Sequence, residues 1–456
     1  MAKIKDIHYI LSMNNRPFRI EWRKLFLTHL FVFVAATITF TLLSHAGLSL
    51  WLFYNSIATI YLVTALMTKY ESLISIKRRY AKDRLGTSGR PVPRASFIIP
   101  AYLPNEEGII LDTVRHILTR VERPVAGLEV VLVYNTPCDL PVEKELKSLE
   151  KEYPEFRAVR VEKSRSKAEN LNRAVTLING EITVIIDADH RPYPDCLTRA
   201  WRWLANEYHV VQGRNVVRNS ARNWFTRMIA VEFETIYAVS HTGKSLIADT
   251  ALFGGSNGFW RTDVLRRFSF DRAMLTEDID ITVRILMEGY RIVHDRSLIS
   301  SEECPDNLTG FWFQRKRWAQ GWLQVMLRHQ RSIWSSRHLN ILQKCFWSYL
   351  LIWREIHNLV SHLPFPLMVC FWIANEEIFF PFNWYIILTI IVSLTGAFIQ
   401  ILAAYVRRDK ETPLAWYVWY SAFYLFFATF KNSIALVGLR DEIMRERNWV
   451  VTRRTG

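Results

Sequence analysis

Two aspartates separated by a single residue follow an apolar run in the segment "ITVIIDADHRPYPD", residues 182–195. In a β-strand, residues i and i+2 point to the same side, so Asp187 and Asp189 would face one spot while Ala188 faces away. Two carboxylates in that arrangement repel each other unless a cation lies between them. The pair therefore predicts a bound Mg²⁺ or Mn²⁺. A solvated acidic pair that caps a loop is the alternative.

Polar groups from two other segments are candidates for the same site. The segment "FIIPAYLPNEE" indicates a strand with Pro100, Tyr102 and Glu106 at its carboxyl end, the edge where open α/β sheets bind ligands. The segment "SKAENLN" supplies a cation and two amides suited to a phosphate and its ribose: Lys167, Asn170 and Asn172. For the lysine, a solvated charge on a helix is the alternative.

Three later segments have residue types that suit a sugar and its acceptor. "FGGSNGFWR" holds three glycines in five residues, so its backbone around Gly255 and Ser256 could approach a sugar closely, although a plain turn is the alternative. "LTEDIDI" places Thr276, Glu277 and Asp278 just before an amphipathic helix, where an N-cap is the alternative to catalysis. "FWFQRKRWAQGW" puts three residues at i, i+3 and i+4 on one face of an aromatic helix suited to a membrane surface: Gln314, Arg317 and Trp318.

The composition combines features of membrane and soluble proteins. The 456 residues are 50% hydrophobic and 22% charged, with a formal net charge of +15. Residues 25–43 and 48–68 are apolar runs of about 20 residues, the length that spans a bilayer, and they predict a helical hairpin. A cleaved signal peptide is the alternative for the first run. Long apolar runs resume at residues 346–374, 384–406 and 413–437.

The distribution of lysine and arginine predicts the orientation in the membrane. Basic residues precede and follow the hairpin and are absent from its connecting loop, so both flanks are expected in the cytoplasm. The chain is thus predicted to be a multi-pass protein of the plasma (inner) membrane with a cytoplasmic catalytic domain. Anionic lipid headgroups explain the remaining positive charge, so no nucleic acid is expected as a partner. The five cysteines lack CxxC spacing, which argues against a zinc site.

The basic residues near the C-terminus leave the topology there open. Arg407 and Arg408 are expected in the cytoplasm, and so are Arg440 and Arg445 beyond the next apolar run. Either residues 413–437 lie partly in the interface, or residues 346–374 form two short passes. Ionisable groups inside the second of these segments, such as Arg354, indicate an interfacial helix or a polar conduit.

Short β-rich stretches alternate with amphipathic ones between the two apolar regions: "ASFIIPAY", "LEVVLVYN", "FRAVRVE", "ITVIIDAD" and "YHVVQGR". This pattern predicts an α/β domain with a mostly parallel sheet. The expected organisation is an N-terminal segment with two transmembrane helices (1–70), a cytoplasmic domain (94–310), interfacial helices (311–345) and a C-terminal transmembrane region with a basic, cytoplasmic-type tail (346–456).

The motifs together resemble those of a known family. Asp187-Ala188-Asp189, Thr276-Glu277-Asp278 and the Gln-x-x-Arg-Trp of residues 314–318 follow the D, DxD, TED and QxxRW order of the processive, membrane-integrated family 2 glycosyltransferases. That family includes cellulose, hyaluronan, chitin and poly-N-acetylglucosamine synthases. The terminal "WVVTRR" is similar to the ending of many members. The resemblance implies a GT-A (Rossmann-like) α/β domain embedded between transmembrane and interfacial α-helices.

The resemblance also implies an activity and its partners. The expected reaction is that of an inverting, processive β-glycosyltransferase that polymerises sugar from a nucleotide-sugar donor, UDP-glucose or UDP-N-acetylglucosamine, and translocates the polysaccharide. The expected partners are the donor, the growing polysaccharide and the lipid bilayer, and an auxiliary secretion subunit could also take part. A non-processive transferase to a lipid carrier is the alternative, and a catalytically inactive membrane sensor or transporter is a more remote one.

Roles for individual residues follow from the same resemblance. Asp278 is expected to be the general base, with Glu277 raising its pKa, and Asp189 with Asp187 is expected to hold the metal. The expected nucleotide-sugar contacts are Pro100, Tyr102, Glu106, Asn135, Lys167 and Asp187. The expected acceptor and diphosphate contacts are Gly255, Ser256, Gln314, Arg317 and Trp318. The sequence departs from the family at Tyr134-Asn135, which replace paired acids and put the identity of the nucleotide in doubt.

Overall fold

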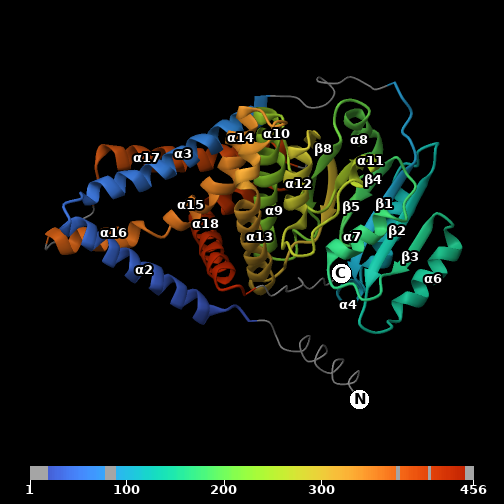
Figure 1. The fold of residues 1–456 in the computed structure, drawn as a ribbon, viewed down its shortest axis with the longest axis horizontal. Helices are drawn as coiled ribbons and strands as arrows, with labels where there is room; N and C mark the ends of the chain where they lie inside the picture. The colour runs from blue at the N-terminus through green and yellow to red at the C-terminus, as the bar shows by residue number, and fades with distance from the viewer. Residues whose placement is uncertain (1–18, 78–88, 376–380, 409–411, 447–456) are drawn as a thin grey trace, which may run out of the picture.

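The computed structural model of the chain describes residues 19–77, 89–375, 381–408 and 412–446 (Figure 1). The terminal "WVVTRR" lies outside these residues, as do most of the basic residues after the predicted hairpin. The strands are β1 (Ala95–Tyr102), β2 (Leu128–Asn135), β3 (Phe156–Arg160), β4 (Ile182–Ile185), β5 (Arg191–Pro192), β6 (Val210–Val217), β7 (Gly258–Arg261) and β8 (Ile292–Glu302).

The helices of the α/β domain are α4 (Leu103–Glu106), α5 (Ile110–Arg120), α6 (Val142–Glu152), α7 (Lys167–Val175), α8 (Cys196–Leu204), α11 (Thr262–Leu265) and α12 (Glu277–Met287). The other helices are α2 (Trp22–His45), α3 (Leu50–Lys77), α9 (Trp224–Phe233), α10 (Thr242–Ala248), α13 (Leu308–Ser335), α14 (Ile341–Ser348), α15 (Arg354–Val360), α16 (Pro364–Asn375), α17 (Trp384–Arg407) and α18 (Leu414–Ile443). Two π-helical segments interrupt them, η2 (Glu234–His241) and η3 (Tyr349–Trp353).

The eight strands form one mixed sheet in the order β3-β2-β1-β4-β7-β6-β8-β5. Strands β3, β2, β1 and β4 are parallel to one another, as the sequence predicts. Strand β7 runs antiparallel between β4 and β6, so the parallel arrangement does not extend across the sheet. The parallel half is the part that brings the carboxyl ends of β1, β2 and β4 to one edge.

Apolar side chains alternate between the two faces of this sheet. Phe97 and Ile99 of β1 lie in a core with α5, α6 and α8, whereas Ile98 lies in a second core with α7, α12 and α13. A parallel strand with both faces covered reads as a continuous apolar run, because neither face meets water. The two cores therefore explain why β1 and β2 are recognisable in the sequence.

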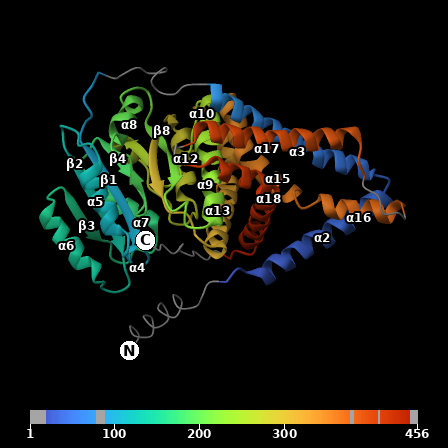
Figure 2. The same cartoon turned by 180° about the vertical axis from the view of Figure 1, so that it is seen from behind.

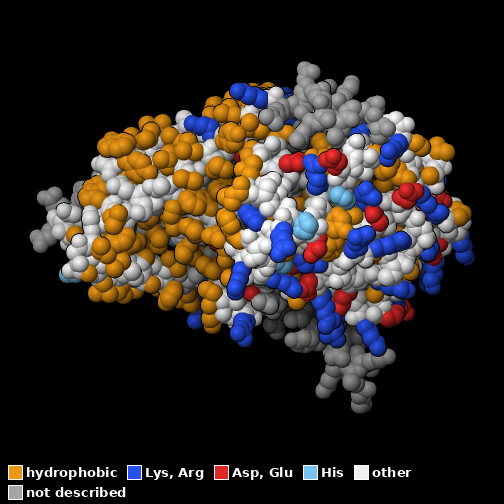
Figure 3. All heavy atoms as spheres, turned by 45° about the horizontal axis from the view of Figure 1, so that its top comes forward, with side chains coloured by type: hydrophobic (Ala, Val, Ile, Leu, Met, Phe, Trp, Pro, Cys, Tyr) orange, Lys and Arg blue, Asp and Glu red, His pale blue; other side chains and the backbone are white. Residues whose placement is uncertain are grey.

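Four of the described helices are long and apolar enough to cross a membrane: α2, α3, α17 and α18. The helices of residues 341–360 and 364–375 are bent by 43° at the break between them and together form a fifth candidate span. Figure 3 shows apolar side chains over the half of the molecule built by α2, α3, α16 and α17, with charged side chains gathered on the other half. These helices indicate that the chain associates with a membrane.

Helix α18 lies along the other helices that cover the domain. At its start the Arg227 guanidinium of α9 lies 5.5 Å from the Trp416 ring centroid, and in its middle Lys431 Nζ donates to Glu232 of α9 at 2.7 Å. Near its end, a Cβ added at Gly438 would lie 3.2 Å from the Lys316 carbonyl of α13. Both ribbon views place α18 beside α9 and α13 (Figures 1 and 2). Helix α18 therefore packs on α9 and α13, and the choice between a span and an interfacial helix for residues 413–437 stays a prediction.

Candidate active site

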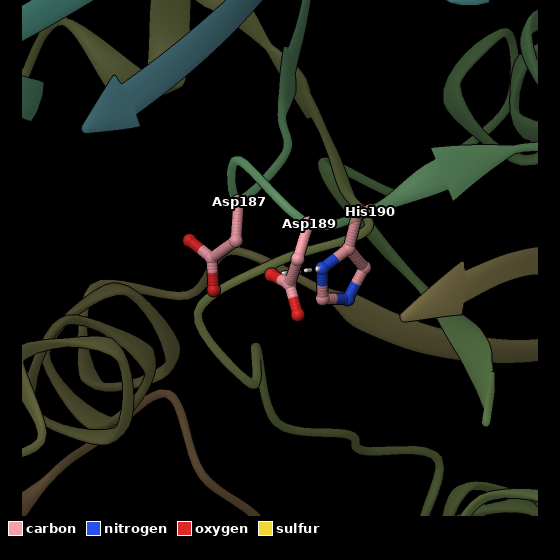
Figure 4. A group of neighbouring side chains, drawn as sticks. All are labelled: Asp187, Asp189 and His190. Atoms are coloured by element: carbon pink, nitrogen blue, oxygen red, sulfur yellow. Dashed lines mark hydrogen bonds and ion pairs between the residues drawn. The ribbon is translucent and has the colours of Figure 1, made fainter. Parts of the chain in front are cut away.

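The two aspartates lie in the turn after β4, which ends at Ile185. The argument from strand alternation is therefore wrong, because the chain turns: the His190 N–H donates to the Asp187 carbonyl at 3.0 Å. The carboxylates nevertheless gather at one place (Figure 4). Ligand atoms of Asp187, Asp189 and His190 all lie within 4.8 Å of one another. The sequence pattern does not single out His190, whose only signal is its place next to the pair.

Asp189 is held more rigidly than Asp187. Only 2% of Asp189 is exposed, and its carboxylate accepts from the Glu303 N–H at 3.2 Å and faces His190 Nδ1 at 3.4 Å. Asp187 is more open, with 32% of its side chain exposed, and its backbone N–H donates to Ser256 Oγ at 2.9 Å. The glycine-rich loop is thus tied directly to the turn that carries the carboxylates.

Lys167 connects this turn to the glycine-rich loop. Ser166 caps α7 by accepting from the Glu169 N–H, which makes Lys167 the first residue of the helix. Its Nζ lies 2.5 Å from Asp187 Oδ1 and donates to the Gly255 carbonyl at 2.8 Å. Burial lowers the pKa of this ammonium, but attraction to Asp187, Glu277 and Asp278 outweighs burial and raises the pKa. The alternative of a solvated helix charge is excluded.

Gly255 brings the same loop against Asp278. Its φ of +84° lies in the left-handed region that favours glycine, and an added Cβ would lie 2.8 Å from Asp278 Oδ2. Burial, and then repulsion from Glu277, raises the pKa of the Asp278 carboxyl to about 7. Thr276 occupies the N-cap position of α12, yet its side chain makes no capping hydrogen bond. The helix-cap alternative for this motif is therefore not supported.

Helix α13 places its motif against the start of α12. Arg317 Nη1 donates to the Leu275 carbonyl at 3.2 Å, and its charge lowers the pKa of Asp278 in part. A Cβ added at Gly321 would lie 2.6 Å from Thr276 Oγ1, so α13 is in close contact with the N-cap residue of α12. Gln314 is buried, and its Oε1 has no hydrogen-bond partner among the residues that the structure describes.

The carboxyl ends of β1 and β2 form the opposite side of the site. Tyr102 pairs with Asn135 in the sheet register, and its N–H donates to the Glu106 carboxylate at 2.8 Å. Asn135 Oδ1 accepts from Asn170 Nδ2 at 2.8 Å. Pro100 lies two residues earlier in β1 and is buried.

Two residues that the sequence analysis singled out near this edge are engaged elsewhere. The sequence predicts that Asn172 contacts a phosphate and its ribose with Lys167, but its side-chain amide donates to the Phe270 carbonyl and accepts from the Phe270 N–H. The Tyr134 ring lies in the core below α5 and α6, and its hydroxyl donates to Glu143 at 2.9 Å. Side chains alternate along a strand, so Tyr134 faces the core and Asn135 faces the other way. Of the two acids that the family has here, only the one replaced by Asn135 therefore concerns the site.

Several characterised and probable glycosyltransferases have sequences similar to this chain, and three of them are compared with it in turn. The probable glycosyltransferase YdaM of Bacillus subtilis (strain 168) is 24% identical over 266 residues, which cover 57% of this chain and 62% of that protein. The probable glucomannan 4-beta-mannosyltransferase 14 of Arabidopsis thaliana is 25% identical over 60% of this chain and 50% of its own. The poly-beta-1,6-N-acetyl-D-glucosamine synthase of Staphylococcus aureus (strain MSSA476) is 24% identical over 58% and 61%. The chain thus spans only half to three fifths of these relatives.

Structure and family comparisons agree on the fold and its class. The mannosyltransferase PcManGT of Pyrobaculum calidifontis, solved in complex with GDP-Man and Mn²⁺, superimposes with a TM-score of 0.56 at 20% identity, covering 86% of this chain and 99% of that one. The expected GT-A fold is thereby confirmed. The family described as "Glycosyl transferase family group 2" matches residues 182–430, more than half of the chain. The chain therefore belongs to glycosyl transferase family group 2.

Proposed function

We propose that the chain transfers a sugar from a nucleotide-sugar donor to the end of a growing β-linked polysaccharide, with inversion at the transferred carbon, and passes the polymer across the membrane. The observation that carries this proposal is the position of Lys167. One ammonium contacts Asp187 on the donor side and the Gly255 carbonyl, beside which Asp278 lies. A cationic site for the leaving diphosphate and a carboxylate base thus adjoin one loop.

Asp278 suits the role of general base. A carboxylate with a pKa near neutrality is a stronger base than an ordinary aspartate and is still partly ionised at pH 7. In the proposed reaction it takes the proton of the acceptor hydroxyl while that oxygen bonds to C1 of the donor sugar. The bond from C1 to the diphosphate oxygen breaks in the same step, so the α-linked donor becomes a β-linkage.

The leaving diphosphate would be stabilised by cations on the donor side. Lys167 and Arg317 supply donors for charge-assisted hydrogen bonds to its oxygens. Asp187 and Asp189 have the oxygen ligands that Mg²⁺ and Mn²⁺ prefer, and His190 offers a third ligand atom within 4.8 Å of theirs. A bound cation would neutralise the negative charge that develops on the diphosphate as the C1 bond breaks.

The names of the relatives support a polysaccharide product and leave the sugar open. They include a poly-beta-1,6-N-acetyl-D-glucosamine synthase and probable glucomannan mannosyltransferases. Asn135, with its oxygen already bonded to Asn170, presents an amide N–H₂ rather than a carboxylate at the edge expected to meet the base. GDP-mannose therefore belongs beside the UDP-sugars as a candidate donor.

Product analysis with the purified full chain in detergent tests this proposal. UDP-glucose, UDP-N-acetylglucosamine, UDP-glucuronate and GDP-mannose are offered separately, each with Mg²⁺, with Mn²⁺ and with excess chelator. We expect one donor to give a polymer that only a β-specific glycosidase degrades, and no polymer with chelator. A single sugar added to lipid would contradict polymerisation, and full turnover in chelator would contradict the role of the cation.

A further inference from the structure

The helix that carries Gln314, Arg317 and Trp318 also carries a buried arginine, Arg315. Only 8% of Arg315 is exposed, and an arginine in that position needs a partner for its charge. Its Nη2 donates to Glu232 Oε2 of α9 at 2.6 Å, and Glu232 is 1% exposed. The pair joins α13 to α9.

A third helix completes this ion cluster. Lys431 of α18 donates to the second oxygen of Glu232 at 2.7 Å. Burial alone raises the pKa of the Glu232 carboxyl, but Arg315 and Lys431 outweigh burial and hold the pKa below its usual value. Glu232 is therefore an ionised carboxylate between two cations. The contacts of this carboxylate link α9, α13 and α18 at one point.

Arg315 also lies against the aromatic ring of the motif. Its guanidinium carbon is 4.3 Å from the Trp318 ring centroid and 4.9 Å from that of Phe311. Residues at i and i+3 are neighbours on a helix surface, and a planar guanidinium packs well on an indole. Trp318 itself is only partly buried, so the guanidinium contacts its ring without enclosing it.

We propose that Arg315 is a positioning residue that fixes the orientation of the Trp318 indole as the platform for the acceptor sugar, with Glu232 and Lys431 as its anchor. The inference rests on the proposed function and on the expectation from the family resemblance that Trp318 contacts the acceptor, which we take to be stacking of its ring on the end of the growing chain. Arg315 does not touch the acceptor: its contact with the indole determines how well the ring can retain the polymer between additions. Because Lys431 belongs to α18, the retention of the polymer also depends on how α18 packs against α9.

The test compares the lengths of the polymers that variants of the full chain make in lipid nanodiscs. The donor is whichever of the four sugar nucleotides named above yields polymer. Arg315→Lys keeps the charge but loses the planar contact, and Glu232→Gln keeps the shape but loses the anchor. We expect both to shorten the product by roughly three- to thirtyfold, the range of a lost cation–π contact. The KM for the donor and the slow hydrolysis of the donor by water should not change. Arg331→Lys, on the exposed side of the same helix, is the matched control.

The outcomes separate this inference from the proposed function. Normal product length in both variants, when Trp318→Ala shortens the product, would overturn the role of Arg315 alone. Unchanged length with Trp318→Ala would overturn the platform itself. Loss of donor hydrolysis and a higher donor KM in Glu232→Gln would show that the cluster merely holds the fold together. If Arg315→Lys does not fold, Glu232→Gln and Lys431→Gln give the same comparison.

Discussion

Asp278 owes its chemistry to its surroundings rather than to its residue type. Burial and the neighbouring Glu277 raise its pKa, whereas Lys167 and Arg317 partly offset the rise. The spacing of the motifs was enough to single out these residues from the sequence. It could not reveal His190 or Arg315, because the carboxylates that they face in the buried interior, Glu302 and Glu232, lie far away in the sequence.

The pH dependence of transfer follows from this pKa. The base must be ionised, and its pKa is raised to about 7, so kcat/KM should rise about tenfold per pH unit below neutrality and level off above it. Glu277→Gln removes one of the causes of the raised pKa, so its profile should shift to lower pH. A pH profile that is flat between about pH 5 and pH 8 in steady-state assays would contradict the assignment.

Helices α12 and α13 set the distance between the base and the acceptor platform. Their contact passes through Gly321, whose missing side chain leaves room for Thr276. The helical pattern and the i, i+3, i+4 spacing of α13 were legible in the sequence. The close approach at Gly321 was not, because nothing local distinguishes this glycine from one that merely weakens a helix.

Gly321→Ala should therefore reduce activity without unfolding the protein. Alanine is the better helix former by about 1 kcal/mol, yet its Cβ would force α13 away from Thr276. A shift of about 1 Å at a catalytic site costs roughly a hundredfold in rate, so we expect a fall in kcat of about 10- to 100-fold. Ser332→Ala, an exposed change on the same helix, is the control. Equal kcat in the two variants would show that the contact does not position the site.

The whole molecule joins the α/β domain to a layer of apolar helices through α9, α13 and α18. The apolar runs in the sequence mark all the candidate membrane spans. Hydropathy alone could not say which of these helices cross the membrane and which pack along the domain. We expect α18 to lie in the membrane interface, because its Lys431 and Trp416 both contact α9. Those pairings join residues about 200 positions apart, beyond the reach of any local pattern.

Cysteine labelling tests the expected topology, in which the domain and both ends of α18 lie on the cytoplasmic side and the α2–α3 loop faces outward. In a variant without the native cysteines, Thr412→Cys and Met444→Cys mark the two ends of α18, Ser49→Cys marks the α2–α3 loop and Ser148→Cys marks the domain. We expect an impermeant maleimide to label only Ser49→Cys in intact cells, and all four after permeabilisation. Labelling of exactly one end of α18 in intact cells would mean that this helix spans the membrane.

The most direct test of the central claim is the comparison of Asp278→Asn with Glu277→Gln. Asparagine keeps the shape of the aspartate but cannot accept the proton, so transfer should fall by roughly 10²- to 10⁴-fold. Donor affinity, measured by calorimetry with the active sugar nucleotide, should stay within about threefold, and Glu277→Gln should lose much less activity. Near-normal polymer synthesis by Asp278→Asn would contradict the account, because the base would then lie elsewhere.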